Sequence, residues 1–393
     1  FYIIVDGTEA SDFTITLGGT ATRAEGAIVA YTGVDLITPF DVTPGSITPR
    51  ANTGNVVTGI TAVTTVTPNA LVLMFGMSSS TNNTARSFTN YAVTTPILAE
   101  IYEVLGTNTV SVGMAAGLKA TTGTTNTGTI NMSGNAYLGG IILVLRPQPP
   151  KQYRSVASGD WSSISTWEQS RTNGVSWEVA TTTPTSTDGL VTIQSAHTVT
   201  LTAAGMASSL VVNGTLDLGV NTLTGSGSGS LSISNTGTLK IGGPSNIPSG
   251  YLAVTLNATS TVEYYYYGNQ TVYEINYGNL ILSGSGTKTL TNVGAIAVNV
   301  LTVGLGTNLL LNGANALTPV SASVNGTFTV SNTASLVKGT GTLSFNSGSA
   351  YNHNRAGGAI PTSTWNLTST CIISGAATTA PTGLTQSFGN FTW

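Results

Sequence analysis

From about residue 190 onward, short runs of residues alternate between apolar side chains and Ser or Thr. Each run ends in a Gly- or Asn-rich turn and is followed by another run, as in Leu210-Val-Val-Asn-Gly-Thr-Leu-Asp-Leu. Successive side chains of a β-strand point to opposite faces, so alternation with a period of two predicts strands. The sequence therefore predicts a series of short strands joined by tight turns.

These runs recur at a nearly constant spacing of about twenty residues, which is typical of solenoids. Each repeat of a solenoid stacks on its neighbours and buries a shared apolar column. We therefore expect a right-handed parallel β-helix over residues 190–393. Its predicted rungs include those at Leu210, Leu231, Val262, Leu280, Val298, Val324, Leu343 and Trp365.

The first 146 residues lack this repeat. They predict about eight strands separated by turn residues, at 1–5, 12–17, 26–31, 56–64, 70–77, 97–105, 108–116 and 136–145. Two hairpins are expected, one joining 56–64 to 70–77 and one joining 97–105 to 109–116. Eight antiparallel strands of this length favour a sandwich of the jelly-roll type over residues 1–146. The predicted core contains Ile28, Val29, Tyr31, Leu71, Leu73, Phe75, Ile101, Val104, Val110, Val112, Ile141, Leu143 and Leu145.

A proline-rich linker is predicted at 147–151, because several prolines in a short stretch favour extended, semi-rigid backbone. Residues 152–189 then contain Trp161, Trp167 and Trp177. The open end of a solenoid must be covered to prevent its edge from pairing with other chains. We expect this Trp-rich segment to be the entry cap of the β-helix.

Composition restricts the possible partners. Only 7% of the residues are charged, whereas 40% are hydrophobic and 47 are Gly. A typical soluble domain has about 25% charged residues, so Ser, Thr and Asn must supply the polar surface. The net charge is −3, and no run of Lys or Arg could neutralise a phosphate backbone, so nucleic acid is not an expected partner. The longest apolar stretch, 137–145, is too short to span a bilayer and predicts a buried strand.

The only cysteine is Cys371, so no internal disulfide is expected, which suits a chain exported without reliance on disulfides. The opening Phe1-Tyr-Ile-Ile-Val and the closing residues 386–393 both have the pattern of a strand. We therefore expect the chain to be a fragment of a larger protein, with the sandwich cut at its start and the β-helix cut at its end.

Several segments resemble a known family. Gly159-Asp160-Trp161, the run 187–193, His197-Thr-Val-Thr-Leu and the run 209–216 are similar to the entry module of β-helical regions in large secreted and cell-surface proteins of Bacteroidota. Many of these proteins are type 9 secretion substrates with adhesin-like roles, and the resemblance implies the same for this chain. It departs from the family pattern by stopping before a C-terminal sorting domain.

A second resemblance concerns the N-terminal part. Gly26-Ala-Ile-Val-Ala-Tyr-Thr-Gly-Val-Asp35 and Pro39-Phe40-Asp41 look like an all-β module of phage and bacterial surface proteins. This resemblance implies a surface location and leaves a phage tail-fibre component as an alternative.

Catalytic groups are sparse. Asp and Glu total 15, and a β-helical glycosidase or lyase would need clustered carboxylates. Glu263 and Glu274 flank the Tyr264–Tyr267 run, but a solvated pair beside a loop is the favoured interpretation. His197 is expected to be structural, and burial of Cys371 is favoured over a nucleophile–base pair with His353. We expect no catalytic residues, no metal site and no cofactor.

The Tyr-rich segment is the most unusual local feature. Aromatic rings stack on sugar faces and provide contact area at protein interfaces, although an aromatic ladder between rungs is the favoured alternative. The candidate ligand-binding residues are Tyr265, Tyr267, Tyr273, Tyr351 and His353.

The sequence predicts a secreted or cell-surface structural and adhesive fragment. Its expected partners are other copies of itself, other surface proteins and glycans, and low charge would permit such association because little repulsion opposes it. The alternatives are a carbohydrate-binding module of a secreted glycan-directed protein and the phage fibre. A polysaccharide-degrading enzyme is disfavoured by the sparse carboxylates.

Overall fold

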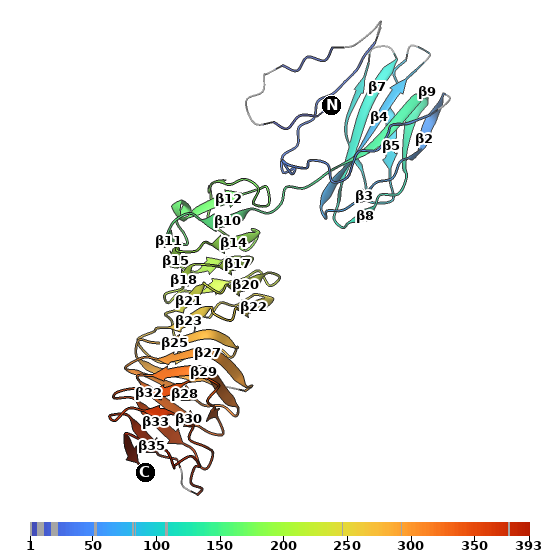
Figure 1. Cartoon of the computed structure of the whole chain (residues 1–393). Helices are drawn as coiled ribbons and strands as arrows, with labels where there is room; N and C mark the ends of the chain where they lie inside the picture. Colours follow the sequence, from blue (N-terminus) through green and yellow to red (C-terminus); the bar gives the residue numbers. More distant parts are fainter. Residues whose placement is uncertain are drawn as a thin grey trace. The chain divides into compact units, whose positions relative to one another are not determined.

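The computed structural model describes residues 2–5, 12–16, 23–50, 53–80, 82, 84–106, 109–245, 247–291, 293–375 and 378–393. Nearly all of its regular structure is β, as predicted. The chain divides into two compact units, residues 1–149 and 150–393 (Figure 1). The division falls inside the stretch that the sequence predicts to be a linker.

The first unit is built from antiparallel strands. They are β1 (Thr48–Pro49), β2 (Gly54–Ile60), β3 (Thr64–Thr65), β4 (Ala70–Ser79), β5 (Phe88–Ala92), β6 (Ala99–Leu105), β7 (Val110–Lys119), β8 (Gly123–Thr124) and β9 (Gly128–Leu145). The predicted strands at 1–5, 12–17 and 26–31 are wrong as far as the structure describes them, because residues 2–5, 12–16 and 26–31 form no strand. Residues 1, 17 and 108 lie outside the described residues.

The long strand β9 belongs to two sheets. Its first part pairs with β2 and β5, and its second part pairs with β4 and β1. The larger sheet continues from β4 to β7 and then to β6, so the predicted hairpin of 97–105 with 109–116 is correct. The predicted hairpin of 56–64 with 70–77 is wrong, because β2 pairs with β9 and β4 lies between β7 and β9.

The sandwich core contains residues from both sheets, but it uses the opposite face of the central strands from the one predicted. The buried core residues of β4 and β9 include Ala70, Val72, Met74, Ile142 and Val144, each one position away from a predicted core residue. Of the predicted core, only Leu73 is buried. Both faces of these strands are apolar, so alternation alone cannot choose between them, and a shift of one residue exchanges the faces.

This assignment of faces can be tested with two identical substitutions. Ile142 is buried in the core, whereas Ile141 is half-buried on the other face. We expect Ile142→Ala to lower the free energy of unfolding of the first unit by roughly 2 to 5 kcal/mol, because it leaves a cavity. Ile141→Ala, the matched control, should cost clearly less in the same denaturant titration. Equal losses would contradict the assignment.

The second unit begins with β10 (Gln152–Ser155), β11 (Gly159–Asp160), the short 3₁₀ helix η1 (Ile164–Thr166), β12 (Trp167–Ser170) and β13 (Glu178–Val179). Its later strands are β14 (Leu190–Ile193), β15 (Thr198–Thr200), β16 (Gly205–Met206), β17 (Ser209–Val212), β18 (Thr215–Asp217), β19 (Leu223–Thr224), β20 (Ser230–Ile233), β21 (Thr238–Ile241), β22 (Ala253–Leu256), β23 (Thr261–Tyr264), β24 (Gln270–Thr271), β25 (Tyr277–Leu282), β26 (Gly286–Leu290), β27 (Ile296–Val303), β28 (Thr307–Leu311), β29 (Ala316–Val324), β30 (Thr327–Ser331), β31 (Ser335–Leu336), β32 (Leu343–Phe345), β33 (Ala350–Asn354), β34 (Thr364–Trp365), β35 (Thr370–Ile373) and β36 (Asn390–Thr392).

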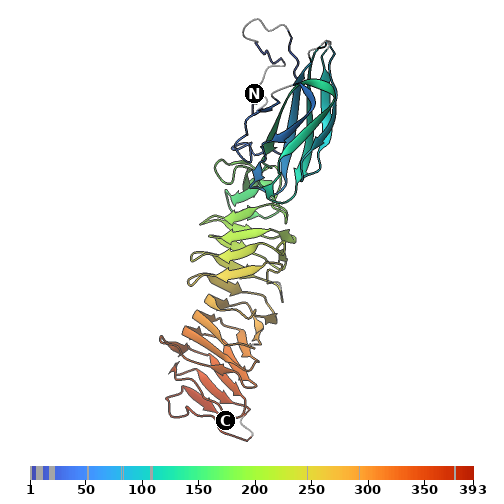
Figure 2. The ribbon, with the colours of Figure 1, turned by 90° about the vertical axis from the view of Figure 1, so that its right-hand side faces the viewer.

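These later strands form a parallel β-solenoid of about 9 turns, which confirms the predicted β-helix (Figure 2). Leu210 pairs with Leu231 and Leu280 with Leu301, so equivalent positions recur about once per predicted repeat. The predicted rung positions do not all lie in one column, because Val298 pairs with Tyr277 instead of Leu280. Alternation places one set of side chains inside, where a continuous hydrophobic cluster runs through the unit.

Within the described residues, this unit has three large sheets and one small sheet made of β16 and β19. The long sheet runs from β11 through β15, β18, β21, β23, β25, β27, β29 and β32 to β34. The entry sheet contains β13, β12, β10, β14, β17, β20 and β22, and the exit sheet contains β24, β26, β28, β30, β33, β35 and β36. The entry sheet therefore ends and the exit sheet begins close to β23, where the Tyr-rich segment lies.

The Trp-rich segment lies at the first turn. Strand β10 pairs in parallel with β14, whereas β12 pairs antiparallel with β10 and β13 pairs antiparallel with β12. This reversal places β12 on the edge of β10 that faces away from the solenoid. The buried rings of Trp161, Trp167 and Tyr153 pack edge to face beneath it. Strand β12 therefore occupies this edge of β10, and the sheet ends at the two-residue strand β13, which is the kind of short edge strand that limits pairing with other chains.

Candidate functional site

The Tyr264–Tyr267 run lies at the corner that follows β23. Tyr264 points into the solenoid and is 1% exposed, whereas Tyr267 is 82% exposed. Tyr265 and Tyr266 are half-buried. The run therefore has an inner part that closes the interior and an outer part that reaches solvent.

The inner tyrosines form a small hydrogen-bonded group. The hydroxyl oxygens of Tyr264 and Tyr277 are 3.2 Å apart, and the backbone N–H of Tyr273 donates to the Tyr264 hydroxyl at 3.0 Å. The Tyr277 hydroxyl donates to the carbonyl oxygen of Tyr273. Burial raises the pKa of Tyr264 to about 12 and that of Tyr277 well above its usual value. Both hydroxyl groups therefore stay protonated further into the alkaline range than an exposed tyrosine, and their hydrogen bonds hold the corner together.

Tyr265 lies against a column of charged side chains on the outer face of the long sheet. Asp217, Lys240 and Glu263 occupy paired positions on three successive rungs. The Tyr265 hydroxyl donates to Asp217 Oδ1 at 2.7 Å, and Lys240 Nζ lies 5.0 Å from the centre of its ring. Lys240 also forms an ion pair with Glu263 at 3.3 Å. These contacts fix the ring of Tyr265 and occupy its hydroxyl group.

The corner is also held from inside by Lys288, which is fully buried. Its Nζ donates to the carbonyl oxygens of Tyr266 at 2.6 Å and Gly268 at 3.2 Å, and to Gln270 Oε1 at 3.0 Å. Burial lowers the pKa of Lys288 to about 8. The amine therefore fixes the backbone on both sides of Tyr267. Lys288 is not among the site residues predicted from the sequence. The alternation in Gly286-Thr-Lys-Thr-Leu290 could have indicated its burial, because it places Lys288 on the same face of the strand as the buried Leu290.

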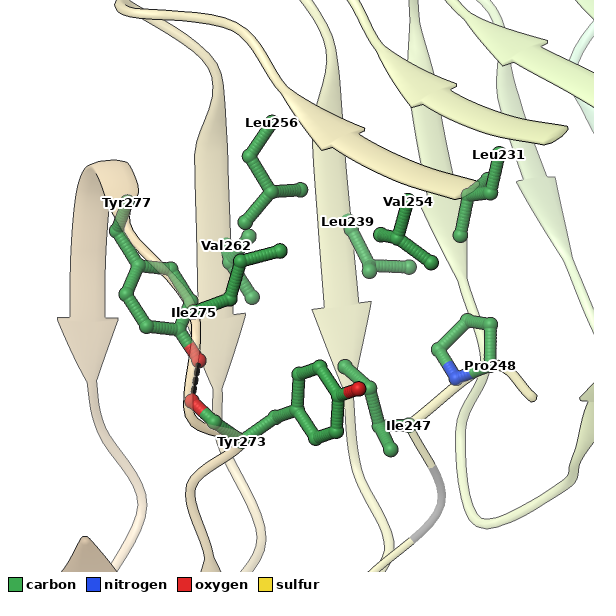
Figure 3. A pocket seen from close by; sticks show the side chains of 10 residues that line it. All are labelled: Leu231, Leu239, Ile247, Pro248, Val254, Leu256, Val262, Tyr273, Ile275 and Tyr277. Carbon is green, nitrogen blue, oxygen red and sulfur yellow. Dashed lines mark hydrogen bonds between the residues drawn. The ribbon is translucent and has the colours of Figure 1, made fainter. Parts of the chain in front are cut away.

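Tyr273 lies at the edge of an apolar cavity (Figure 3). The cavity lies between β20 to β23 and the segments around Ile247 and Ile275. Its volume of about 10 Å³ leaves room for about one water molecule. It is lined by Leu231, Leu239, Ile247, Pro248, Val254, Leu256, Val262, Tyr273, Ile275 and Tyr277. As it stands, the cavity is too small for an organic ligand.

The structure does not support Tyr351 and His353 as ligand contacts, because both side chains are buried in the solenoid. Tyr351 packs between Phe328 and Phe345 in an aromatic stack that continues to Trp365. Its hydroxyl lies 3.2 Å from His353 Nδ1, and His353 Nε2 lies 2.7 Å from the carbonyl oxygen of Gly357. The same alternation that buries the Tyr351 ring also buries His353, two residues further on.

The remaining candidates have structural partners. Cys371 pairs with Tyr351 across the exit sheet and is fully buried, and burial raises the pKa of its thiol to about 12. His197 Nδ1 lies 2.9 Å from Ser155 Oγ. Glu263 accepts from Ser283 Oγ, whereas Glu274 accepts from the N–H of Val293. Thus none of these groups forms the nucleophile–base or carboxylate pair considered from the sequence.

Two wider observations hold for the described part of the chain. No three side chains of His, Cys, Asp or Glu come together there as a group that could hold a metal ion. The same residues include no helix with the length and apolar character needed to cross a bilayer.

No protein-family model, curated protein or solved structure matches the chain.

Proposed function

We propose that this chain is an extracellular structural and adhesive part of a larger surface or fibre protein, in which the solenoid carries the N-terminal sandwich. The observation that supports this role best is the parallel solenoid of about 9 turns with one continuous apolar column. Each added rung satisfies its backbone hydrogen bonds with its neighbours, so the structure gains length without a larger core.

The surface chemistry supports the same proposal. Outside the Asp217–Lys240–Glu263 column, the outer positions of the long sheet carry mostly Ser, Thr and Asn, as at Thr198, Thr215, Thr238 and Thr261. Such a face is polar but nearly uncharged, so it opposes close contact with other surfaces only weakly. The resemblance of residues 159–216 to entry modules of Bacteroidota surface proteins is consistent with export and adhesion.

The location can be tested on cells of the source organism with an antibody raised against the purified chain. We expect immunogold labelling on intact cells, at a density that permeabilisation does not increase. An antibody to a cytosolic protein, which should label only permeabilised cells, is the control. Labelling of this chain only after permeabilisation would contradict an extracellular role.

A further inference from the structure

One corner of the solenoid contains a groove whose lining residues differ from the candidate residues of the Tyr-rich segment. It lies between the long and exit sheets and has a volume of about 310 Å³. Its lining comes from successive turns of the chain: Gly286, Thr287, Leu305, Gly306, Thr307, Asn308, Asn325, Gly326, Thr327 and Gly348. Equivalent residues of neighbouring rungs are about 4.8 Å apart, so the groove follows the solenoid axis with a regular period.

Glycines keep this groove open. A Cβ atom at Gly326 would lie 2.2 Å from the carbonyl oxygen of Thr307 and 2.3 Å from that of Gly304, so no side chain fits there. Gly286, Gly306 and Gly348 adopt positive φ angles of 75°, 76° and 74°, where other residues are strained. Four turns therefore each contribute a position without a side chain, and together they form a trough.

The lining is polar but uncharged. Thr287, Asn308, Asn325 and Thr327 supply hydroxyl and amide groups, which can donate hydrogen bonds. The amide oxygens of Asn308 and Asn325 each already accept one hydrogen bond within the solenoid, from Thr329 Oγ1 and Asn346 Nδ2. An anionic or cationic polymer would find no opposite charge in this groove, whereas a hydroxyl-rich neutral chain would find matching groups.

Two exposed apolar side chains lie along the same corner. Leu305 lines the groove and is 79% exposed. Tyr267 is bridged to Ser285, the residue before Gly286, and therefore lies one rung closer to the N-terminus. Because Lys288 holds the carbonyl groups of Tyr266 and Gly268, the turn that carries Tyr267 is fixed in advance, which lowers the entropy cost of binding. The flat face of a sugar ring packs well on such apolar surfaces.

We propose that this corner groove binds an extended, neutral glycan that runs along the solenoid axis, with Tyr267 and Leu305 packing on sugar rings and Thr and Asn side chains bonding to hydroxyl groups. The regular rung spacing would let one type of contact repeat along a polymer. The inference rests on the proposed adhesive role and names neutral glycans as the class of molecule to which the chain adheres.

The test is calorimetric titration of the full chain with cellohexaose, mannohexaose and chitohexaose, and with a hexauronate as the charged comparison. We expect at least one neutral hexasaccharide to bind and the hexauronate not to bind. The double variant Tyr267→Ala/Leu305→Ser should weaken binding by about tenfold or more. Both replaced side chains are exposed, so folding should be preserved.

Leu252→Ser is the matched control, because Leu252 is 77% exposed but does not line the groove. The affinity of this variant for the neutral hexasaccharide should equal that of the unchanged chain. The inference is overturned if no neutral hexasaccharide binds, if only the hexauronate binds, or if the double variant and the control have the same affinity. Surface labelling of intact cells together with any of these results would leave the proposed location standing and reject only the glycan groove. Labelling confined to permeabilised cells would reject the proposed function itself.

Discussion

Replacing Trp167 with Ala is expected to lower the free energy of unfolding of the first solenoid turns by about 3 to 5 kcal/mol. The Trp167 ring is 1% exposed and packs on Trp161 and Tyr153, with ring centres 5.2 Å and 6.4 Å away. Its Nε1 also donates to the carbonyl oxygen of Trp161 at 3.0 Å. The substitution would leave a large cavity beneath β12 and remove the ring that holds the antiparallel hairpin on β10.

Hydrogen exchange can locate this loss as well as measure it. In a solenoid, each repeat is stabilised mainly by its nearest neighbours. Amides of β14 and β17 should therefore lose far more protection than those of β30 and β33. Trp177→Ala is the control, because Trp177 is half-buried and its ring centre lies 4.4 Å from the Arg154 guanidinium, outside the group of buried rings. An equal loss in both variants, or an equal loss in every rung, would show that Trp167 does not hold the entry end.

We also expect the free energy of unfolding to rise with pH in the alkaline range because of Lys288. Its pKa is about 8 in the folded chain, and we take its ordinary value of about 10.4 for the unfolded chain. Between these values the unfolded state binds more protons, so the free energy of unfolding increases as pH rises. The expected gain from about pH 7.5 to pH 9.5 is roughly 2 kcal/mol.

Other groups act in the opposite direction over part of this range. Burial raises the pKa of Cys371 and of Tyr264, so folding becomes less favourable once these groups ionise in the unfolded chain. The readout is therefore the difference between the unchanged chain and Lys288→Met, measured by denaturant titration at several pH values. This variant lacks the amine but keeps the other groups. Between about pH 7.5 and pH 9.5, its free energy of unfolding should therefore rise by roughly 2 kcal/mol less than that of the unchanged chain. Identical pH dependence in both proteins would show that Lys288 does not titrate in this range.

Lys288 shows what the local sequence predicts about a buried side chain and what it does not. Alternation in the run that ends at Leu290 already places Lys288 on the inner face, next to apolar residues. It gives no sign of the carbonyl groups of Tyr266 and Gly268 that receive the amine, because these belong to the preceding rung. The partner is decided by the register between rungs, which pairs Gln270 with Lys288.

At the candidate site, too, alternation predicts which side chains are buried but not which of them come together. Tyr267 is exposed and Tyr264 is buried, as alternation requires. Tyr351 and His353 were predicted to contact a ligand because they form a polar aromatic cluster, yet they are buried together because residues two apart share a face. The groove at Gly286 to Gly348 could not be predicted, since its residues come from separate turns and none is unusual by itself.

The sequence by itself determined the all-β class and the parallel solenoid, because a period of two within strands and a repeat of about twenty residues leave few other ways to bury the apolar side chains. Only the tertiary structure decided which face of β4 and β9 forms the sandwich core, how β9 is shared between two sheets, and which rungs enclose Lys288 and the corner groove. Local patterns determine the spacing of the inward-pointing side chains along each strand. Which strand lies beside which, and which of two apolar faces is covered, depends on contacts between segments far apart in the chain.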